Sequence, residues 1–299
     1  MPTPRFVFLA VVLTVSFCLS AFAQDDENAV VTVDSSIVVL NATITDGAGR
    51  HVPGLAKSQF TVLEDGVEQE ISTFTAEDTP FAAVILLDTS GSMEQRVALA
   101  RSAAIRFLDG LRETDAAQIY NFDTKVTLVQ KFSNSRDISE KIFDLKAYGF
   151  TALNDSIYRA ATDLSNRPEK RRAIIVLSDG ADNRSEHSAD RALKAALAAN
   201  AVIYTVDMSS IDTGQKERLQ SQGALRNFAE KTGGSFIKTP GGAALRTAFE
   251  QIVGELGKQY TIAYEPKKVM KDGKWRAIEL RVAKSNLTIR TRKGYHAQK

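Results

Sequence analysis

The chain has 299 residues, of which 43% are hydrophobic and 25% are charged, and its formal net charge is +2. This balance gives no reason to expect a nucleic-acid partner, because such partners select strongly basic surfaces. The only cysteine, Cys18, lies in the N-terminal segment. The rest of the chain therefore has no disulfide, no thiol nucleophile and no thiolate metal site.

The first 23 residues have the pattern of a secretory signal peptide. Arg5 provides a positive start, residues 6–20 are apolar, and the small residues Ala21 and Ala23 mark a cleavage site. We expect cleavage after Ala23 and an exported protein, either periplasmic or secreted. The apolar run is short for a membrane span, and a retained anchor is the alternative interpretation. No later run approaches spanning length, so we expect no transmembrane segment in the mature chain.

Residues 24–79 and 258–299 are predicted to be β segments. β-branched runs separated by glycine turns indicate strands at 30–33, 37–44, 60–63, 69–74, 260–264, 275–282 and 287–292. Neither segment has enough strands to bury a core. We therefore expect the two segments to pair into one small β-sandwich. The lysines around residues 271–274 are interpreted as a solvated hairpin turn, with binding to an acidic glycan or wall polymer as the alternative.

Residues 80–257 alternate between strand and helix patterns. The predicted strands are 81–87, 117–122, 126–132, 173–177, 202–206 and 235–238, and the predicted helices are 94–111, 137–145, 151–164, 189–199, 217–231 and 243–257. Such alternation predicts an α/β fold in which a doubly wound, mostly parallel sheet is covered on both faces.

Oxygen-bearing side chains follow the first strand of this segment at alternate positions: Asp88, Ser90 and Ser92. Ligands of doubly wound sheets bind at the carboxyl ends of strands, where the strand order reverses. If strand 173–177 lies beside strand 81–87, then Asp179, and Thr151 at a helix start, reach the same crevice. Hard divalent cations prefer oxygen ligands of this kind.

These five residues, in this order, resemble the metal-ion-dependent adhesion site of the von Willebrand factor type A family. The threonine stands in Gly-Phe-Thr-Ala-Leu at 149–153, where relatives often have Gly-Gly-Thr-Ala-Leu, so Phe150 departs from the common form. The resemblance covers roughly residues 80–257. It implies a site holding Mg²⁺, or another divalent cation such as Mn²⁺ or Ca²⁺, through Asp88, Ser90, Ser92, Thr151 and Asp179.

The flanks are similar to exported bacterial von Willebrand factor A-related proteins, which are common in acidobacteria. The similarity rests on residues 60–71 and on the ending Arg-Lys-Gly-Tyr at 292–295. It implies export and fold but names no ligand.

The expected function is that of an adhesion-type module. Three of the five oxygens are neutral hydroxyls, so a bound cation would stay electrophilic and accept a carboxylate from a partner's Asp or Glu. One alternative is an envelope scaffold protein with a stabilising metal site, and another is a metal-dependent hydrolase. We expect no enzyme, because the sequence has no nucleophile elbow, phosphate loop or His-Glu-x-x-His.

Each site residue also has a plain structural interpretation. Asp88 or Ser92 could cap the following helix, and Thr151 could cap its own. Asp179 with Gly180 could be an ordinary turn. Asp182 is interpreted as a surface acid with an outer-shell role as the alternative.

Overall fold

The computed structural model describes residues 37–76, 79–134, 139–210, 214–238 and 242–298. The predicted signal peptide and strand 30–33 lie outside these residues. The described residues belong to one compact unit, Ser36–Lys299. Among them, no helix is long and apolar enough to cross a membrane.

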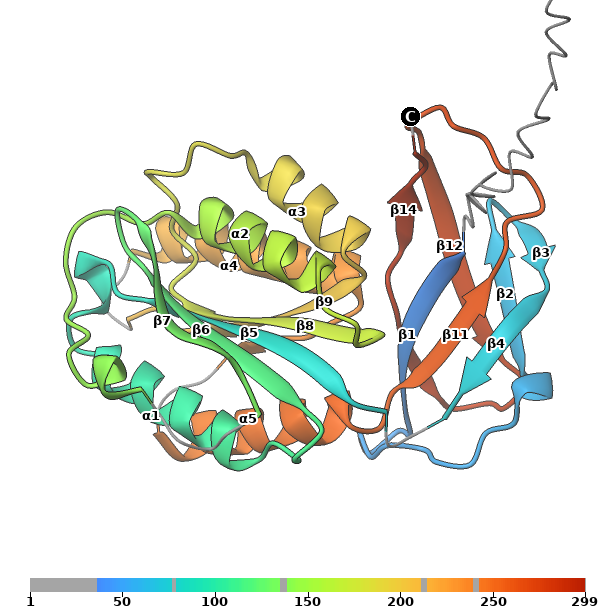
Figure 1. The fold of residues 1–299 in the computed structure, drawn as a ribbon, viewed down its shortest axis with the longest axis horizontal. Helices are drawn as coiled ribbons and strands as arrows, with labels where there is room; N and C mark the ends of the chain where they lie inside the picture. Colours follow the sequence, from blue (N-terminus) through green and yellow to red (C-terminus); the bar gives the residue numbers. More distant parts are fainter. Residues whose placement is uncertain (1–36, 77–78, 135–138, 211–213, 239–241, 299) are drawn as a thin grey trace, which may run out of the picture. The chain divides into compact units, whose positions relative to one another are not determined.

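A six-stranded sheet forms the centre of the α/β segment (Figure 1). Its order is β10-β9-β8-β5-β6-β7. The strands are β5 (Phe81–Asp88), β6 (Ala116–Phe122), β7 (Val126–Ser133), β8 (Arg171–Ser178), β9 (Ala201–Asp207) and β10 (Phe236–Lys238). All neighbours pair in parallel except β6 with β7. The sheet is therefore mostly parallel, as the alternating pattern predicts.

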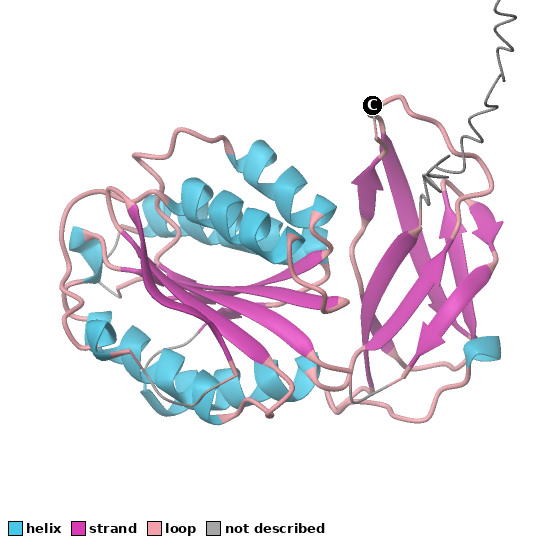
Figure 2. Cartoon of the chain, viewed as in Figure 1, coloured by secondary structure: helices cyan, strands magenta, loops and turns pink. Residues whose placement is uncertain are grey.

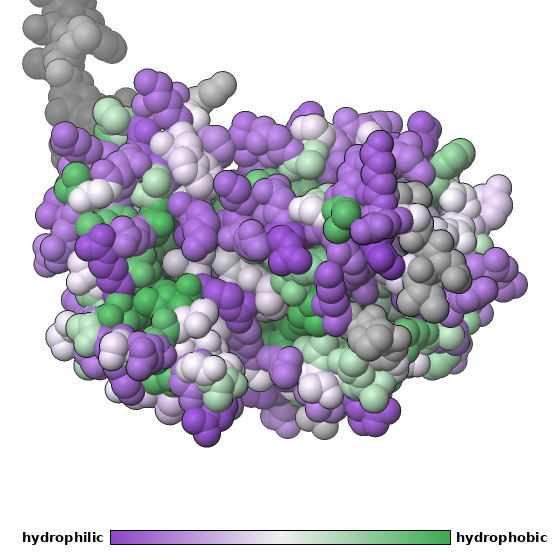
Figure 3. Space-filling view, turned by 180° about the vertical axis from the view of Figure 1, so that it is seen from behind, coloured by the Kyte–Doolittle hydropathy of each residue, from purple (hydrophilic) through white to green (hydrophobic). Residues whose placement is uncertain are grey.

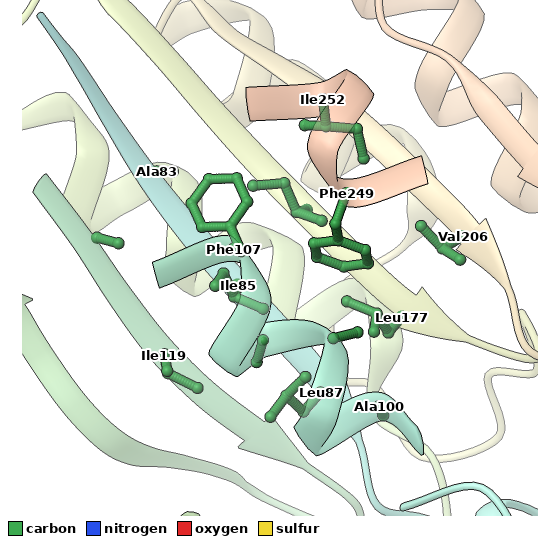
Figure 4. Packing of buried hydrophobic residues seen from close by; sticks show 14 of the residues in the cluster. Ala83, Ile85, Leu87, Ala100, Phe107, Ile119, Leu177, Val206, Phe249 and Ile252 are labelled. Atoms are coloured by element: carbon green, nitrogen blue, oxygen red, sulfur yellow. The ribbon is translucent and has the colours of Figure 1, made fainter. Parts of the chain in front are cut away.

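Helices cover both faces of this sheet (Figure 2). Helices α2 (Leu153–Ser165), α3 (Ala189–Ala198) and α4 (Gln215–Thr232) lie on one face, and α1 (Val97–Asp109) and α5 (Gly242–Leu256) lie on the other. Phe107 of α1 and Phe249 of α5 meet edge to face over the sheet, with ring centroids 6.2 Å apart (Figure 4). Residues 81–88 of β5 are all buried, because a central parallel strand has protein on both faces.

Strands from both flanks build two four-stranded sheets. One has the order β13-β1-β11-β4 and the other β14-β12-β2-β3. The strands are β1 (Val38–Thr45), β2 (Phe60–Glu64), β3 (Val67–Gln69), β4 (Ile71–Thr75), β11 (Tyr260–Tyr264), β12 (Trp275–Val282), β13 (Thr288–Arg290) and β14 (Gly294–His296). Their inward side chains form one hydrophobic core that includes Leu40, Val62, Tyr260 and Leu280. Each sheet thus contains strands from both ends of the chain.

Buried polar contacts join the end of α5 to the strands that follow it. Arg171, which is fully buried, donates hydrogen bonds to the carbonyl oxygens of Leu256 and Gly257 at 3.3 and 3.2 Å, and also to that of Gln259. The last carbonyl groups of a helix lack partners within the helix. Arg171 at the start of β8 therefore satisfies groups that would otherwise be buried without a donor.

The prediction of a helix over 137–145 is wrong for the described residues 139–145. Only a single 3-10 turn forms there, at Glu140–Ile142. Ile142 is buried, but the neighbouring Phe143 is 58% exposed. One turn with one fully buried side chain gives a helix too little packing to persist.

Two predictions about the β segments are also corrected. The predicted strand 69–74 divides at Glu70 into β3 and β4, which belong to different sheets. The predicted hairpin around residues 271–274 is instead a crossing loop, because β11 and β12 lie in opposite sheets. A turn sequence marks a change of direction but does not say which sheet the next strand joins.

Candidate metal centre

Asp88 is the most buried member of the predicted site. It ends β5 and is 0% exposed. Its Oδ1 accepts a hydrogen bond from the backbone N–H of Ser90 at 2.9 Å, and its Oδ2 accepts one from the Ser178 hydroxyl at 2.5 Å. Burial raises the pKa of Asp88 to about 7 despite these bonds, and the nearby charge of Asp179 adds to the rise. A desolvated carboxylate beside a second acid is an unfavourable place for negative charge.

The two serines of the loop lie beside each other. The hydroxyl oxygens of Ser90 and Ser92 are 3.2 Å apart. Ser90 is buried and Ser92 is exposed. The residue at the N-cap of α1 is Arg96, and no side chain caps that helix. The interpretation of Asp88 and Ser92 as helix caps is therefore wrong. Their oxygens lie in the loop that follows the C-terminal end of β5.

Thr151 is fixed to Asn183 through both its backbone N–H and its carbonyl group. Its N–H donates to Asn183 Oδ1 at 2.8 Å, and its carbonyl accepts the N–H of Asn183 at 3.1 Å. The residue is only 2% exposed. Helix α2 begins at Leu153 without a side-chain cap. The Thr151 hydroxyl thus does not cap its helix, contrary to the plain structural interpretation.

The loop before Thr151 is tied directly to the Asp88–Ser92 loop. The N–H of Tyr148 donates to the carbonyl of Thr89 at 2.8 Å, and the N–H of Gly91 donates to the carbonyl of Gly149 at 3.2 Å. Gly149 has φ +75, and a Cβ there would lie 2.4 Å from the hydroxyl of Thr124. The loop can therefore pass this close to Thr124 only with glycine at position 149.

Asp179 follows β8, and β8 lies beside β5 with Leu87 opposite Leu177. Its Oδ1 accepts the N–H of Ala181 at 3.1 Å, and the side chain is half-buried. The next residue, Gly180, has φ +83 and lies so close to the carbonyl of Ser221 that a Cβ would clash at 2.6 Å. Asp179 does form a turn, and that turn is held in a fixed conformation next to Asp88.

Sequence reasoning missed two residues that hold the site together. The Ser178 hydroxyl donates a hydrogen bond to Asp88 and accepts one from the N–H of Gly180 at 2.9 Å. The Asn183 side chain accepts a hydrogen bond from the N–H of Thr151. The role of Ser178 follows from the register of β5 against β8, which places Ser178 opposite Asp88. A sequence pattern that predicts neighbouring strands does not fix their register. The signal that could have identified Ser178 was a polar residue ending an otherwise apolar strand.

The donor set fits a hard divalent cation. Among the described residues, no group of three or more His, Cys, Asp or Glu could hold a metal ion. Any cation here would instead depend on two carboxylates and three hydroxyls from Asp88, Asp179, Ser90, Ser92 and Thr151. Oxygen donors of this kind suit Mg²⁺ or Ca²⁺ rather than softer metals. The buried charge of Asp88 is the feature that a cation would stabilise most.

Comparisons with solved structures show proteins of related architecture. The PilB minor pilin from Streptococcus sanguinis is 14% identical, with a TM-score of 0.47; the match covers 60% of this chain and 62% of that one. The chain thus spans less than two thirds of that pilin's length. The vWF domain of the type V pili tip protein Mfa5 from Porphyromonas gingivalis is 14% identical, with a TM-score of 0.49, over 60% of this chain and 95% of that one.

A von Willebrand factor type A protein from Catenulispora acidiphila matches more of the chain. It is 15% identical with a TM-score of 0.50, over 89% of this chain and 75% of that one, and this likeness shows the fold. No curated protein matches the chain. The family model for the von Willebrand factor type A domain matches residues 83–181, a range that includes all five candidate ligands. Residues 83–181 of the chain thus resemble the von Willebrand factor type A domain, and the sheet built around β5 and β8 has the fold of such proteins.

Proposed function

We propose that this protein is a metal-dependent protein-binding module. Asp88, Ser90, Ser92, Thr151 and Asp179 hold a divalent cation, with Mg²⁺ as the first candidate. A partner protein supplies an Asp or Glu carboxylate to that cation. The protein acts by capture and not as an enzyme.

The burial of Asp88 is the observation that carries this proposal. A carboxylate that is 0% exposed and has another acid nearby costs stability unless a positive charge compensates it. Among the described residues, the hydrogen bonds to its carboxylate come from Ser90 and Ser178. Both are neutral donors, so a cation is the missing compensation.

Some residues of the proposed site would bind the cation, and others would hold these ligands in position. Asp88 and Asp179 provide the negative charge, and the three hydroxyls provide neutral oxygens. Ser178 and Asn183 orient Asp88 and Thr151. When bound, the cation would supply a Lewis-acidic position that a partner carboxylate can occupy. The two carboxylates would formally balance the charge of a divalent cation, and the three hydroxyls would add only neutral donors, so the cation could still accept a further carboxylate ligand.

Export of the protein is part of the same proposal. It rests on the signal-peptide pattern of residues 1–23, with cleavage after Ala23 and a periplasmic or secreted product. A partner would then be another envelope or extracellular protein. The proposed site contains no cysteine, so an oxidising compartment would leave its ligands unchanged.

The metal is tested first, with MgCl₂ alone as the probe. Isothermal titration should detect binding that Asp179→Asn or Thr151→Val weakens at least about tenfold, the scale seen when one ligand or its support is removed. Asp190→Asn is the matched control, because Asp190 is an exposed acid on α3 that pairs with Lys194. Absence of Mg²⁺, Mn²⁺ and Ca²⁺ binding in the unaltered protein would refute the metal site.

The partner is tested second. Affinity capture from an envelope extract, with Mg²⁺ or with EDTA, should recover a protein only in the presence of the metal and only with Asp88 intact. Capture that survives both EDTA and Asp88→Ala would refute metal-mediated binding. A metal that raises thermal stability while capture is unaffected would instead favour the scaffold alternative.

A further inference from the structure

One end of the β-sandwich exposes an unusual share of the large apolar side chains. Among the described residues, eight large hydrophobic side chains are exposed, and Ile37, Val67, Val269 and Met270 are four of them, at 45, 51, 57 and 51%. The strand registers place these four at the same end. Figure 3 shows one face of the molecule, on which hydrophilic residues predominate and hydrophobic residues form separate areas.

The registers define this end, which we name the distal end, as residues 37, 65–67 and 265–276. Val38 pairs with Tyr264, so Ile37 lies beside the start of the loop 265–274. That loop leads directly into Trp275 of β12. The turn before Val67 also lies here, because the N–H of Asp65 donates to the carbonyl of Ala277 at 2.9 Å. Figure 1 shows the C-terminus at this same end.

Lysines surround the apolar side chains of the distal end. Val269 and Met270 stand between Lys267 and Lys268 on one side and Lys271 and Lys274 on the other, and all four lysines are exposed. Asp272 forms an ion pair with Arg276, in which Arg276 Nη2 lies 2.8 Å from Asp272 Oδ1. The loop 265–274 has four lysines against Glu265 and Asp272 and so carries a net charge of +2. Outside the loop, the exposed acids Asp65, Glu68 and Glu70 offset part of this positive charge.

Both ends of the loop 265–274 are fixed to the sandwich. The N–H of Lys267 donates to Gln69 Oε1 at 2.9 Å. At the other end, the N–H of Gly273 donates to the carbonyl of Gln298 at 3.1 Å, and that of Ala297 to the carbonyl of Lys274 at 2.8 Å. The loop therefore projects Val269 and Met270 from a rigid base, which lowers the entropy cost of binding through them.

The distal end is also where the chain enters the sandwich. β1 begins at this end, where Val38 pairs with Tyr264. The connections to the α/β segment lie at the other end of β11, where Thr75 pairs with Thr261. Contacts made by the distal end would leave the candidate metal centre unobstructed.

We propose that the distal end binds the surface of an anionic phospholipid bilayer. Lys267, Lys268, Lys271 and Lys274 face the phosphate headgroups, and Val269 and Met270 enter the boundary with the acyl chains. The apolar tip favours lipid over a soluble polyanion, because a polyanion would use the lysines but offers nothing to cover two exposed apolar side chains. This inference does not depend on the metal site.

The test is vesicle co-sedimentation with protein that begins at Gln24, which retains the whole compact unit Ser36–Lys299. Vesicles of equal parts phosphatidylglycerol and phosphatidylcholine should bind the protein, and vesicles of phosphatidylcholine alone should not. Binding should weaken as salt rises from about 0.05 M to about 0.5 M. Trp275, the only tryptophan, gives a second readout, because its fluorescence should change on binding.

Two double variants separate the charged and apolar contributions. Lys267→Gln with Lys268→Gln should weaken binding about 25-fold, since each lysine near an anionic surface contributes about fivefold. Val269→Ser with Met270→Ser should weaken it at least about tenfold.

The control replaces lysines at the opposite end of β12. Lys57→Gln with Lys284→Gln makes the same change in net charge at exposed positions and should leave binding unchanged. The proposal is overturned if phosphatidylglycerol vesicles do not bind, or if the control weakens binding as much as the distal lysines do. It is also overturned if heparin competes fully while the Val269 and Met270 variant binds normally, which would indicate a soluble polyanion.

Discussion

Replacing Asp88 by Asn should stabilise the metal-free protein while abolishing its response to metal. An aspartate with a pKa of 3.8 when unfolded and about 7 when folded lowers the free energy of unfolding by about 4 kcal/mol at pH 8, because one pKa unit corresponds to about 1.4 kcal/mol. Asn keeps the shape of the side chain without its charge. We expect a gain of about 2 to 4 kcal/mol for Asp88→Asn in EDTA.

The sign of this effect depends on pH in a defined way. Folding raises the pKa, so the folded state holds the proton more tightly than the unfolded state does. The destabilisation by Asp88 is therefore absent below about pH 4, grows as the pH rises, and is complete above about pH 7. The advantage of Asp88→Asn should therefore shrink by about 2.6 kcal/mol between pH 8 and pH 5, to about 1 kcal/mol or less.

Urea denaturation in EDTA at pH 5 and pH 8 measures this difference, and repeating it with MgCl₂ measures the response to metal. Saturating Mg²⁺ at 100 times its dissociation constant should add about 2.7 kcal/mol to the unaltered protein and nothing to the variant. Asp115→Asn is the control. Asp115 is 1% exposed but pairs with Arg112 Nε at 3.0 Å, so its loss should destabilise by about 2 kcal/mol or more.

The opposite result for Asp88 would refute the reasoning. If Asp88→Asn is less stable than the unaltered protein in EDTA at pH 8, then the buried carboxylate is already compensated within the chain. The need for a cation would then have no support from stability.

Three further substitutions test the packing and the recognition surface. Gly149→Ala places a Cβ within 2.4 Å of a threonine hydroxyl at a backbone φ of +75. It should lower the free energy of unfolding in urea by about 2 kcal/mol and weaken Mg²⁺ binding. The control Gly47→Ala, with nothing within 4 Å of its Cβ, should lower it far less. Phe249→Ala removes a fully buried ring and should cost about 3 to 5 kcal/mol, seen as a lower Tm; a change below about 1 kcal/mol would contradict the described core. Tyr148→Ser with Phe150→Ser, at side chains 77 and 59% exposed, should leave Mg²⁺ titration unchanged but reduce capture of the partner at least about tenfold; unchanged capture would show that these rings lie outside the interface.

The alternating pattern of residues 80–257 was enough to predict the class of fold, because buried parallel strands read as continuous apolar runs. Residues 84–87 and 174–177 have that character, and both prove to be central strands. Where packing is local, as in α2, the helical spacing of apolar residues also agrees with the structure. Apolar runs and helical spacing can be recognised in each segment of the sequence without knowledge of its partners in the fold.

The errors occurred where structure depends on distant partners. The segment 139–145 forms only one turn, because Ile142 is its only fully buried side chain and its contacts are to Gln130 of β7 and Arg101 of α1. The loop 265–274 connects two sheets, a fact that no turn residue reveals. Ser178 became visible only through its register opposite Asp88. The five proposed ligands were chosen by order and spacing, and their coordination of a metal stays a prediction.

The position of the proposed site on β5 has a mechanical consequence. Asp88 ends β5, whereas Phe81 begins it close to the connection from β4. A pull between a captured partner and the sandwich would load β5 along its length. Hydrogen bonds to β6 and β8 flank it on both sides in parallel register, so they would be loaded together in shear and not broken one at a time. This geometry suits a protein that must hold its partner under tension.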